Sequence, residues 1–161
     1  ETYSKALNAG QYPLSILALT SESADLYRKG IYGNTMTGNP RAMDIGSAVL
    51  GMVTDEIRQN IVDRGHEFVE KLKALAVELD GAITKVEGTG LLFSCELEPR
   101  FKAYGTDSAE EFMRMKGIGV IHGGENSLRF TPHFQVTSAE VDLIVDCVRN
   151  AVLQGPQAGS A

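Results

Sequence analysis

The chain has 161 residues, of which 43% are hydrophobic and 22% charged, a composition typical of one globular domain with its own core. The net charge of −6 and the lack of a Lys/Arg run argue against nucleic-acid binding, and no apolar stretch is long enough to span a bilayer. Cys95 and Cys147 lie far apart in apolar runs, so we expect two buried thiols and a cytoplasmic setting. The three histidines have no partners at metal-ligand spacing, so no metal site is expected.

The first 38 residues predict two strands, a short helix and a loop. One strand ends near Lys5, and the continuous apolar run at residues 14–19 has the length of a buried strand. Residues 21–28 can form a short helix, and residues 30–40 form a loop rich in glycine and small polar residues. Because the chain begins at Glu1 within a strand pattern, we expect it to be part of a longer protein.

Two helical patterns follow this loop. Asn39 and Pro40 make a favourable helix start, as N-cap and first helical residue. Apolar residues then recur at helical spacing. They are Ala42, Ile45, Val49, Met52, Val53 and Ile57 in the first pattern, and Val62, Phe68, Leu72, Leu75 and Leu79 in the second.

The remaining chain predicts four short strands and two further helices. The strands are expected at residues 83–86, 91–97, 119–121 and 127–131. They come as two pairs with tight glycine-containing connections, which favours a largely antiparallel sheet. Capping boxes at Ser108/Glu111 and Thr137/Glu140 predict the helix starts. The result is a two-layer α+β unit, with residues 155–161 as a flexible tail.

Three segments contain side chains that suit chemistry. Lys5 follows a strand end and precedes a small-residue turn, so it can reach a cleft, where burial would make its amine a nucleophile toward an aldehyde. Taken alone, however, such a lysine is more often on the surface. The loop around Asn34 and Thr35 leads into a helix N-terminus, which suits a phosphate but also an ordinary N-cap. Arg129 alternates with apolar neighbours on a strand, which fits a carboxylate ligand or a structural ion pair.

These segments resemble, in the same order, those of class III aminotransferases, the family of acetylornithine, ornithine and 4-aminobutyrate aminotransferases. The four matching segments are Ser4-Lys5-Ala6-Leu7-Asn8-Ala9-Gly10-Gln11-Tyr12-Pro13, Tyr32-Gly33-Asn34-Thr35-Met36-Thr37-Gly38-Asn39-Pro40, Val86-Glu87-Gly88-Thr89-Gly90-Leu91-Leu92 and Asn126-Ser127-Leu128-Arg129-Phe130-Thr131-Pro132. Glu87 stands where the family has Arg, and His133 stands where many members have a second Pro.

The resemblance implies a pyridoxal 5'-phosphate (PLP) site. Lys5 would form the internal aldimine with PLP and then move the proton between substrate and cofactor. Thr35, with Asn34 beside it, would contact the phosphate of the PLP in the partner subunit, which implies a homodimer with shared active sites. Arg129 would bind a carboxylate of the substrate.

The resemblance also implies an α/β architecture, the PLP fold type I. Residues 1–38 would end the large cofactor domain, and residues 39–154 would form a linking helix and a small α+β C-terminal domain with a mostly antiparallel sheet. The rest of the cofactor site would lie in a missing upstream half of the same protein, so the chain alone is expected to be inactive.

The expected activity is amino transfer from an amino donor to a keto acid, ketone or aldehyde. Two alternatives stay open: another PLP reaction on the same fold, by a racemase or aminomutase, and a non-catalytic α+β interaction module.

Overall fold

The computed structural model describes residues 1–31, 33 and 38–157. Contacts divide the chain into two compact units, Glu1–Thr54 and Asp55–Ala161. The expected domain ranges, 1–38, 39–154 and 155–161, stay a prediction. The contacts place α2 (Pro40–Met52) in the first unit because this helix packs against η1 (Lys5–Asn8).

Among its described residues, the first unit has a two-stranded sheet and three helical segments. Strand β1 (Thr2–Ser4) pairs antiparallel with β2 (Ser15–Leu17), which confirms two strands in these regions. Strand β2 is exposed, because its sheet has only these two strands among the described residues, so the expectation of a buried strand is wrong. Helix α1 (Ser21–Ala24) is shorter than expected, because the backbone continues beyond it in tight turns, with hydrogen bonds from Leu26 N–H to Ser23 O and from Tyr27 N–H to Ala24 O.

Helix α2 begins as the sequence predicts. The Asn39 side-chain oxygen accepts hydrogen bonds from the N–H groups of Arg41 (3.1 Å) and Ala42 (3.4 Å), and Pro40 is the first helical residue. The helix ends at Met52, so the expectation that it includes Ile57 is wrong. A new helix starts at Asp55, where acidic residues in the first turn complement the helix dipole.

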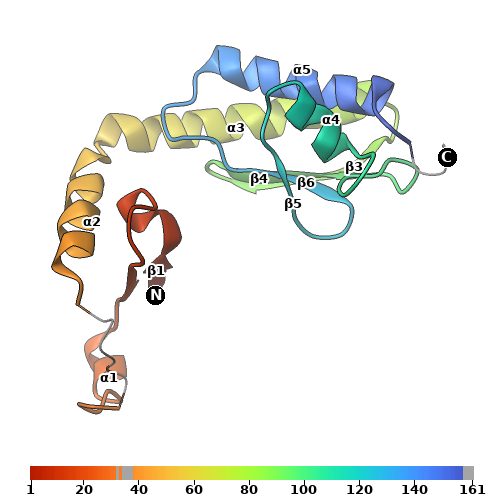
Figure 1. The fold of residues 1–161 in the computed structure, drawn as a ribbon. Helices are drawn as coiled ribbons and strands as arrows, with labels where there is room; N and C mark the ends of the chain where they lie inside the picture. Colours follow the sequence, from red (N-terminus) through yellow and green to blue (C-terminus); the bar gives the residue numbers. More distant parts are fainter. Residues whose placement is uncertain (32, 34–37, 158–161) are drawn as a thin grey trace. The chain divides into compact units, whose positions relative to one another are not determined.

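The second unit is a four-stranded sheet with three helices. Its elements are α3 (Asp55–Glu78), β3 (Ile83–Thr89), β4 (Leu92–Leu97), α4 (Ala109–Met115), β5 (Ile121–His122), β6 (Ser127–Phe130) and α5 (Ser138–Gln154). The strand order is β3-β4-β6-β5, and every neighbouring pair is antiparallel, which confirms the predicted sheet. Helices α3 and α5 lie side by side over one face of the sheet (Figure 1). No helix in the described ranges is long and apolar enough to cross a membrane.

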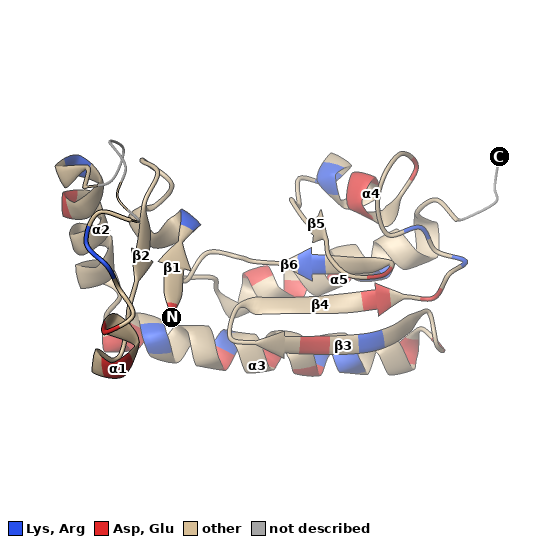
Figure 2. Cartoon of the chain, turned by 90° about the horizontal axis from the view of Figure 1, so that it is seen from below, with Lys and Arg blue, Asp and Glu red and all other residues tan. Residues whose placement is uncertain are grey.

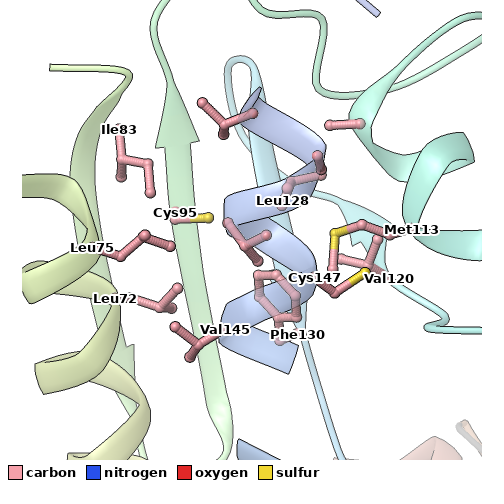
Figure 3. Packing of buried hydrophobic residues seen from close by; sticks show 14 of the residues in the cluster. Leu72, Leu75, Ile83, Cys95, Met113, Val120, Leu128, Phe130, Val145 and Cys147 are labelled. Carbon is pink, nitrogen blue, oxygen red and sulfur yellow. The ribbon is translucent and has the colours of Figure 1, made fainter. Parts of the chain in front are cut away.

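The core of the second unit lies between this sheet and the two long helices. Alternate residues of β4, namely Phe93, Cys95 and Leu97, are buried, because successive side chains of a strand point to opposite faces. Figure 3 shows residues from α3, β4, β6 and α5 meeting in this layer. Both cysteines are buried and free, as expected, and burial raises the pKa of the Cys95 thiol to about 12.

An aromatic stack runs through the core from helix to sheet. The ring of Phe93 on β4 lies 4.1 Å from that of Phe68 on α3 and 5.1 Å from that of Phe130 on β6, measured between centroids. Because all three rings are buried, the stack ties α3 to the two central strands.

Helix α3 also approaches the β3–β4 turn at backbone distance. A Cβ atom placed on Gly65 would lie 2.3 Å from the carbonyl oxygen of Gly90, so no other residue fits there without displacement. Gly90 itself has φ of 52°, in the left-handed region that glycine tolerates best. The two glycines therefore set the position of the turn on the helix.

The two predicted capping boxes differ in the structure. Thr137 and Glu140 form a full box: Glu140 N–H donates to Thr137 Oγ1 (3.3 Å), and Thr137 N–H donates to the Glu140 carboxylate (2.7 Å). The hydrogen bonds that the Glu140 carboxylate accepts from the N–H and the hydroxyl of Thr137 lower its pKa. At α4, Ser108 Oγ accepts from Glu111 N–H, but the Glu111 carboxylate accepts from Asp107 N–H instead. The predicted helix start is confirmed, with only half of the box.

Candidate active site

Lys5 is the first residue beyond the β1–β2 ladder. The pairing ends at Ser4 and Ser15, and Lys5 then opens the 3-10 helix with φ of 59°. A non-glycine residue in this left-handed region carries strain of about 1–3 kcal/mol, and such strain gathers at functional sites. The side chain is exposed, and its amine makes no hydrogen bond or ion pair to another described residue. Among the described residues, nothing therefore competes with a ligand for this amine.

The turn after Lys5 is anchored by a buried asparagine. Asn8 is fully buried, and its side-chain nitrogen donates a hydrogen bond of 2.8 Å to the carbonyl of Tyr12. Helix α2 packs closely on this turn: a Cβ atom on Gly46 would lie 3.0 Å from Leu14 Cδ2 and 3.9 Å from Asn8 Cβ. This packing holds the backbone that carries Lys5. The sequence offered no signal for the role of Asn8 beyond its place in the matched segment.

The predicted phosphate-contacting residues, Asn34 and Thr35, lie outside the described residues, so their role stays a prediction. At the described helix end beside them, Asn39 is an ordinary N-cap, because its side chain accepts from the N–H groups of Arg41 and Ala42.

Arg129 lies on the sheet face opposite the helices. Its neighbours Leu128 and Phe130 are buried in the core, while Arg129 is exposed, as strand alternation requires. The register places it beside Ser94 of β4 and Ile121 of β5. Charged residues lie on β3, β4 and β6, the strands of this face (Figure 2). Within the described part of the chain, the Arg129 guanidinium has no ion pair or hydrogen bond.

A hollow of about 480 Å³ opens on this face next to Arg129. The end of β3, the first half of β4 and the β5–β6 turn line it, and Glu87, Leu92 and Ser94 are among the lining residues. The Glu87 carboxylate pairs with Lys85 at 3.0 Å, so its charge is balanced on its own strand. An unpaired guanidinium beside a hollow is suited to bind a carboxylate through two parallel hydrogen bonds.

The Asn126 side chain fixes the start of β6, the strand that carries Arg129. Its side-chain nitrogen donates to the carbonyls of Leu97 (2.9 Å) and Phe101 (2.8 Å), and its oxygen accepts from the N–H of Ala103 (3.0 Å). Its φ is 44°, which asparagine tolerates better than most residues. The side chain thus ties the loop after β4 to the start of β6. Asn126 belongs to the matched segment, but no pattern in the sequence indicates this role.

Two histidines near the β5–β6 hairpin have partners other than Arg129. The hairpin pairs His122 with Leu128, and the His122 ring stacks on Tyr104 with centroids 4.6 Å apart, so His122 does not share the sheet face of Arg129. His133 Nε2 lies 3.6 Å from the Glu140 carboxylate. In the described ranges, no three His, Cys, Asp or Glu side chains gather as a metal site would require.

Comparison with known proteins decides the family. Residues 1–152 match the aminotransferase class-III family. The chain belongs to this family. Succinylornithine transaminases of Salmonella agona and Citrobacter koseri are 31% and 33% identical to it over 141 residues, which make up 87% of this chain and 34% of each relative. This class III chain therefore spans about a third of the length of these curated relatives.

Solved structures give the same fold. Acetylornithine aminotransferase from Elizabethkingia anophelis has a TM-score of 0.80 at 26% identity, covering 94% of this chain and 40% of that one. An amine transaminase from an uncultivated Pseudomonas species, in its PLP-bound form, has a TM-score of 0.80 at 25% identity, covering 94% and 37%. The expected fold, part of a fold type I α/β aminotransferase with an antiparallel small-domain sheet, is confirmed for this class III chain.

Proposed function

We propose that this chain is part of a PLP-dependent aminotransferase, which moves an amino group from an amino donor to a keto acid, ketone or aldehyde. The observation that carries the proposal is Lys5, whose amine has no partner among the described residues and whose backbone is strained at a strand end, in a chain that matches the class III family over residues 1–152. The relatives named above are transaminases, and one related structure is named as PLP-bound.

The residues of this chain fit PLP. A primary amine at a strand end suits the cofactor aldehyde, and a threonine hydroxyl suits its phosphate. When bound, PLP supplies an electron sink that stabilises negative charge at the reacting carbon. We assign Lys5 as the lysine that holds PLP and, once displaced, moves the proton at the substrate carbon, because a mobile amine can act as both base and acid.

Further roles follow for the complete protein. Thr35, with Asn34 beside it, contacts the phosphate in the partner subunit's site, so the active enzyme is a homodimer. The rest of each site comes from the part of the protein that this chain does not span. The two buried free cysteines suit a reducing compartment, which supports a cytoplasmic location.

Arg129 binds a carboxylate of the substrate. Its guanidinium is exposed beside the hollow on the open sheet face and has no partner among the described residues. The names of the relatives include succinylornithine and acetylornithine, both of which carry carboxylates. We therefore propose an amino acid of the ornithine type as amino donor.

Borohydride reduction of the complete protein with PLP tests the assignment of Lys5. We expect a pyridoxyl group on the peptide that contains Lys5, found by mass spectrometry, and no such group in Lys5→Ala. Lys29, an exposed lysine of the same unit, serves as the internal control and should stay unmodified. Modification of Lys29 without modification of Lys5 would contradict the proposal.

Simple assays distinguish amino transfer from the two alternatives, another PLP reaction and a non-catalytic interaction module. Transamination requires a keto acceptor, whereas racemisation proceeds without one. An interaction module would be recovered without cofactor and without the dimer that Thr35 requires.

A further inference from the structure

Gly123 lies directly against the side chain of Arg129. This glycine is in the turn between β5 and β6, and its N–H donates a hydrogen bond of 3.1 Å to the carbonyl of Ser127. A Cβ atom placed on Gly123 would lie 3.1 Å from Arg129 Cδ, 3.3 Å from Cβ and 3.3 Å from Nε. Such distances are tighter than ordinary van der Waals contacts, so the Arg129 stem occupies the space that a side chain at position 123 would take.

The glycine is required for space and not for its backbone conformation. Its neighbour Gly124 has φ of 74°, in the left-handed region, whereas Gly123 does not have a positive φ. At Gly124 a Cβ atom would approach nothing nearer than Ser127 Oγ at 3.8 Å. The two adjacent glycines therefore serve different purposes, and only Gly123 acts on Arg129.

Arg129 depends on this contact for its direction. No described carboxylate or carbonyl holds its guanidinium, so an ion pair does not fix the side chain. The apolar stem of an arginine can be held by packing instead, which leaves the charged head free for a ligand. The stem lies over the Gly123 backbone, with the hollow of about 480 Å³ beside both residues.

We propose that Gly123 is a positioning residue for Arg129 and thereby favours substrates that carry a carboxylate. This inference rests on the proposed role of Arg129 as the carboxylate-binding residue. A side chain at position 123 displaces the Arg129 Cδ and Nε atoms and turns the guanidinium away from a ligand in the hollow. Because the carboxylate is bound equally in the ground state and in the transition state, KM rises while kcat is kept.

The test uses the complete dimeric holoenzyme and glutarate as a carboxylate probe. The dissociation constant is measured by calorimetry for the wild type, Arg129→Ala, Gly123→Ala, Gly123→Val and the double variant Arg129→Ala/Gly123→Val. Gly119→Ala is the matched control, because a Cβ atom on Gly119 has nothing within 4 Å and its φ is not positive. Circular dichroism verifies the fold of each variant.

We expect Gly123→Val to weaken glutarate binding about tenfold, since a charge-assisted hydrogen-bond pair is disturbed. Gly123→Ala should weaken it by a few-fold in the same direction, and this variant decides the matter if the valine variant does not fold. In the Arg129→Ala background the valine should have no further effect, because Gly123 acts through Arg129. With L-ornithine as donor, Gly123→Val should raise KM and change kcat less than twofold.

The outcomes separate the inference from the proposed function. If the wild type and Arg129→Ala bind glutarate equally, the proposed role of Arg129 is wrong. If Arg129→Ala weakens binding but folded variants at Gly123 match Gly119→Ala, the positioning role of Gly123 is wrong while the proposed function stands. An additional effect of the valine in the double variant would also overturn the inference.

Discussion

Replacement of Phe93 by alanine is expected to remove much of the stability of the second unit. Phe93 is 2% exposed, and its ring lies between those of Phe68 and Phe130, at 4.1 and 5.1 Å. Truncation of a buried phenylalanine costs about 3–5 kcal/mol in lost transfer energy and cavity formation. Because two stacked ring pairs are lost as well, we expect about 4–5 kcal/mol here.

Urea unfolding followed by circular dichroism measures this loss. With a slope of about 2 kcal/mol per molar urea, the midpoint of Phe93→Ala should fall by about 2 M. Leu92→Ala is the matched control, because Leu92 is the adjacent residue on the open face and is 56% exposed. It should change the free energy of unfolding by about 0.5 kcal/mol or less. A loss below about 1 kcal/mol for Phe93→Ala, or equal losses for both variants, would refute the packing argument.

Three further predictions use the same unfolding assay or simple chemistry. Gly65→Ala should lower the free energy of unfolding by about 1–3 kcal/mol despite the better helix propensity of alanine, because its Cβ atom would lie 2.3 Å from the carbonyl oxygen of Gly90. Gly51→Ala is the control: its Cβ atom would have nothing within 4 Å, so this variant should be neutral or stabilising. The N–H of the N-cap residue Thr137 lowers the pKa of Glu140 in the folded protein, so the ionised carboxylate stabilises the fold above its unfolded-state pKa, and this stabilisation is lost as the pH falls through its folded-state pKa. Glu140→Gln should therefore flatten the acid part of the curve of unfolding free energy against pH. An unchanged curve would contradict this. Burial raises the pKa of both thiols, so iodoacetamide at pH 8 should leave Cys95 unmodified until the protein unfolds. Cys147 lies beside a surface hollow and should be modified sooner. Rapid labelling of Cys95 in the native protein would count against its burial.

Local patterns in the sequence were sufficient to predict most of the second unit. The alternation in β4 and the capping box of α5 depend on nearest neighbours along the chain, so they can be read without the fold. The break between α2 and α3 was misplaced, because apolar spacing continues through Val53 to Ile57 although the backbone does not. Acidic residues at a new helix start were the available signal.

The sequence singles out candidate site residues but not the packing that supports them. Motif and chemistry coincide at Lys5 and Arg129, and their roles stay predictions. The strained backbone of Lys5 and the contact between Gly123 and Arg129 depend on three-dimensional packing, which no spacing in the sequence encodes. In the same way, Gly65 appears from the sequence to be a weak point of a helix, and only its approach to Gly90 explains it.

The side chain of Asn126 has a consequence for the chemical ageing of the protein. Its amide nitrogen donates to the carbonyls of Leu97 and Phe101, with 2.9 and 2.8 Å between the atoms. Slow loss of that amide would leave an aspartate, which has no hydrogen to donate and whose charge repels carbonyl oxygens. A single deamidation would therefore release the loop after β4 from the strand that carries Arg129, and in an old preparation this arginine would no longer be held in one place.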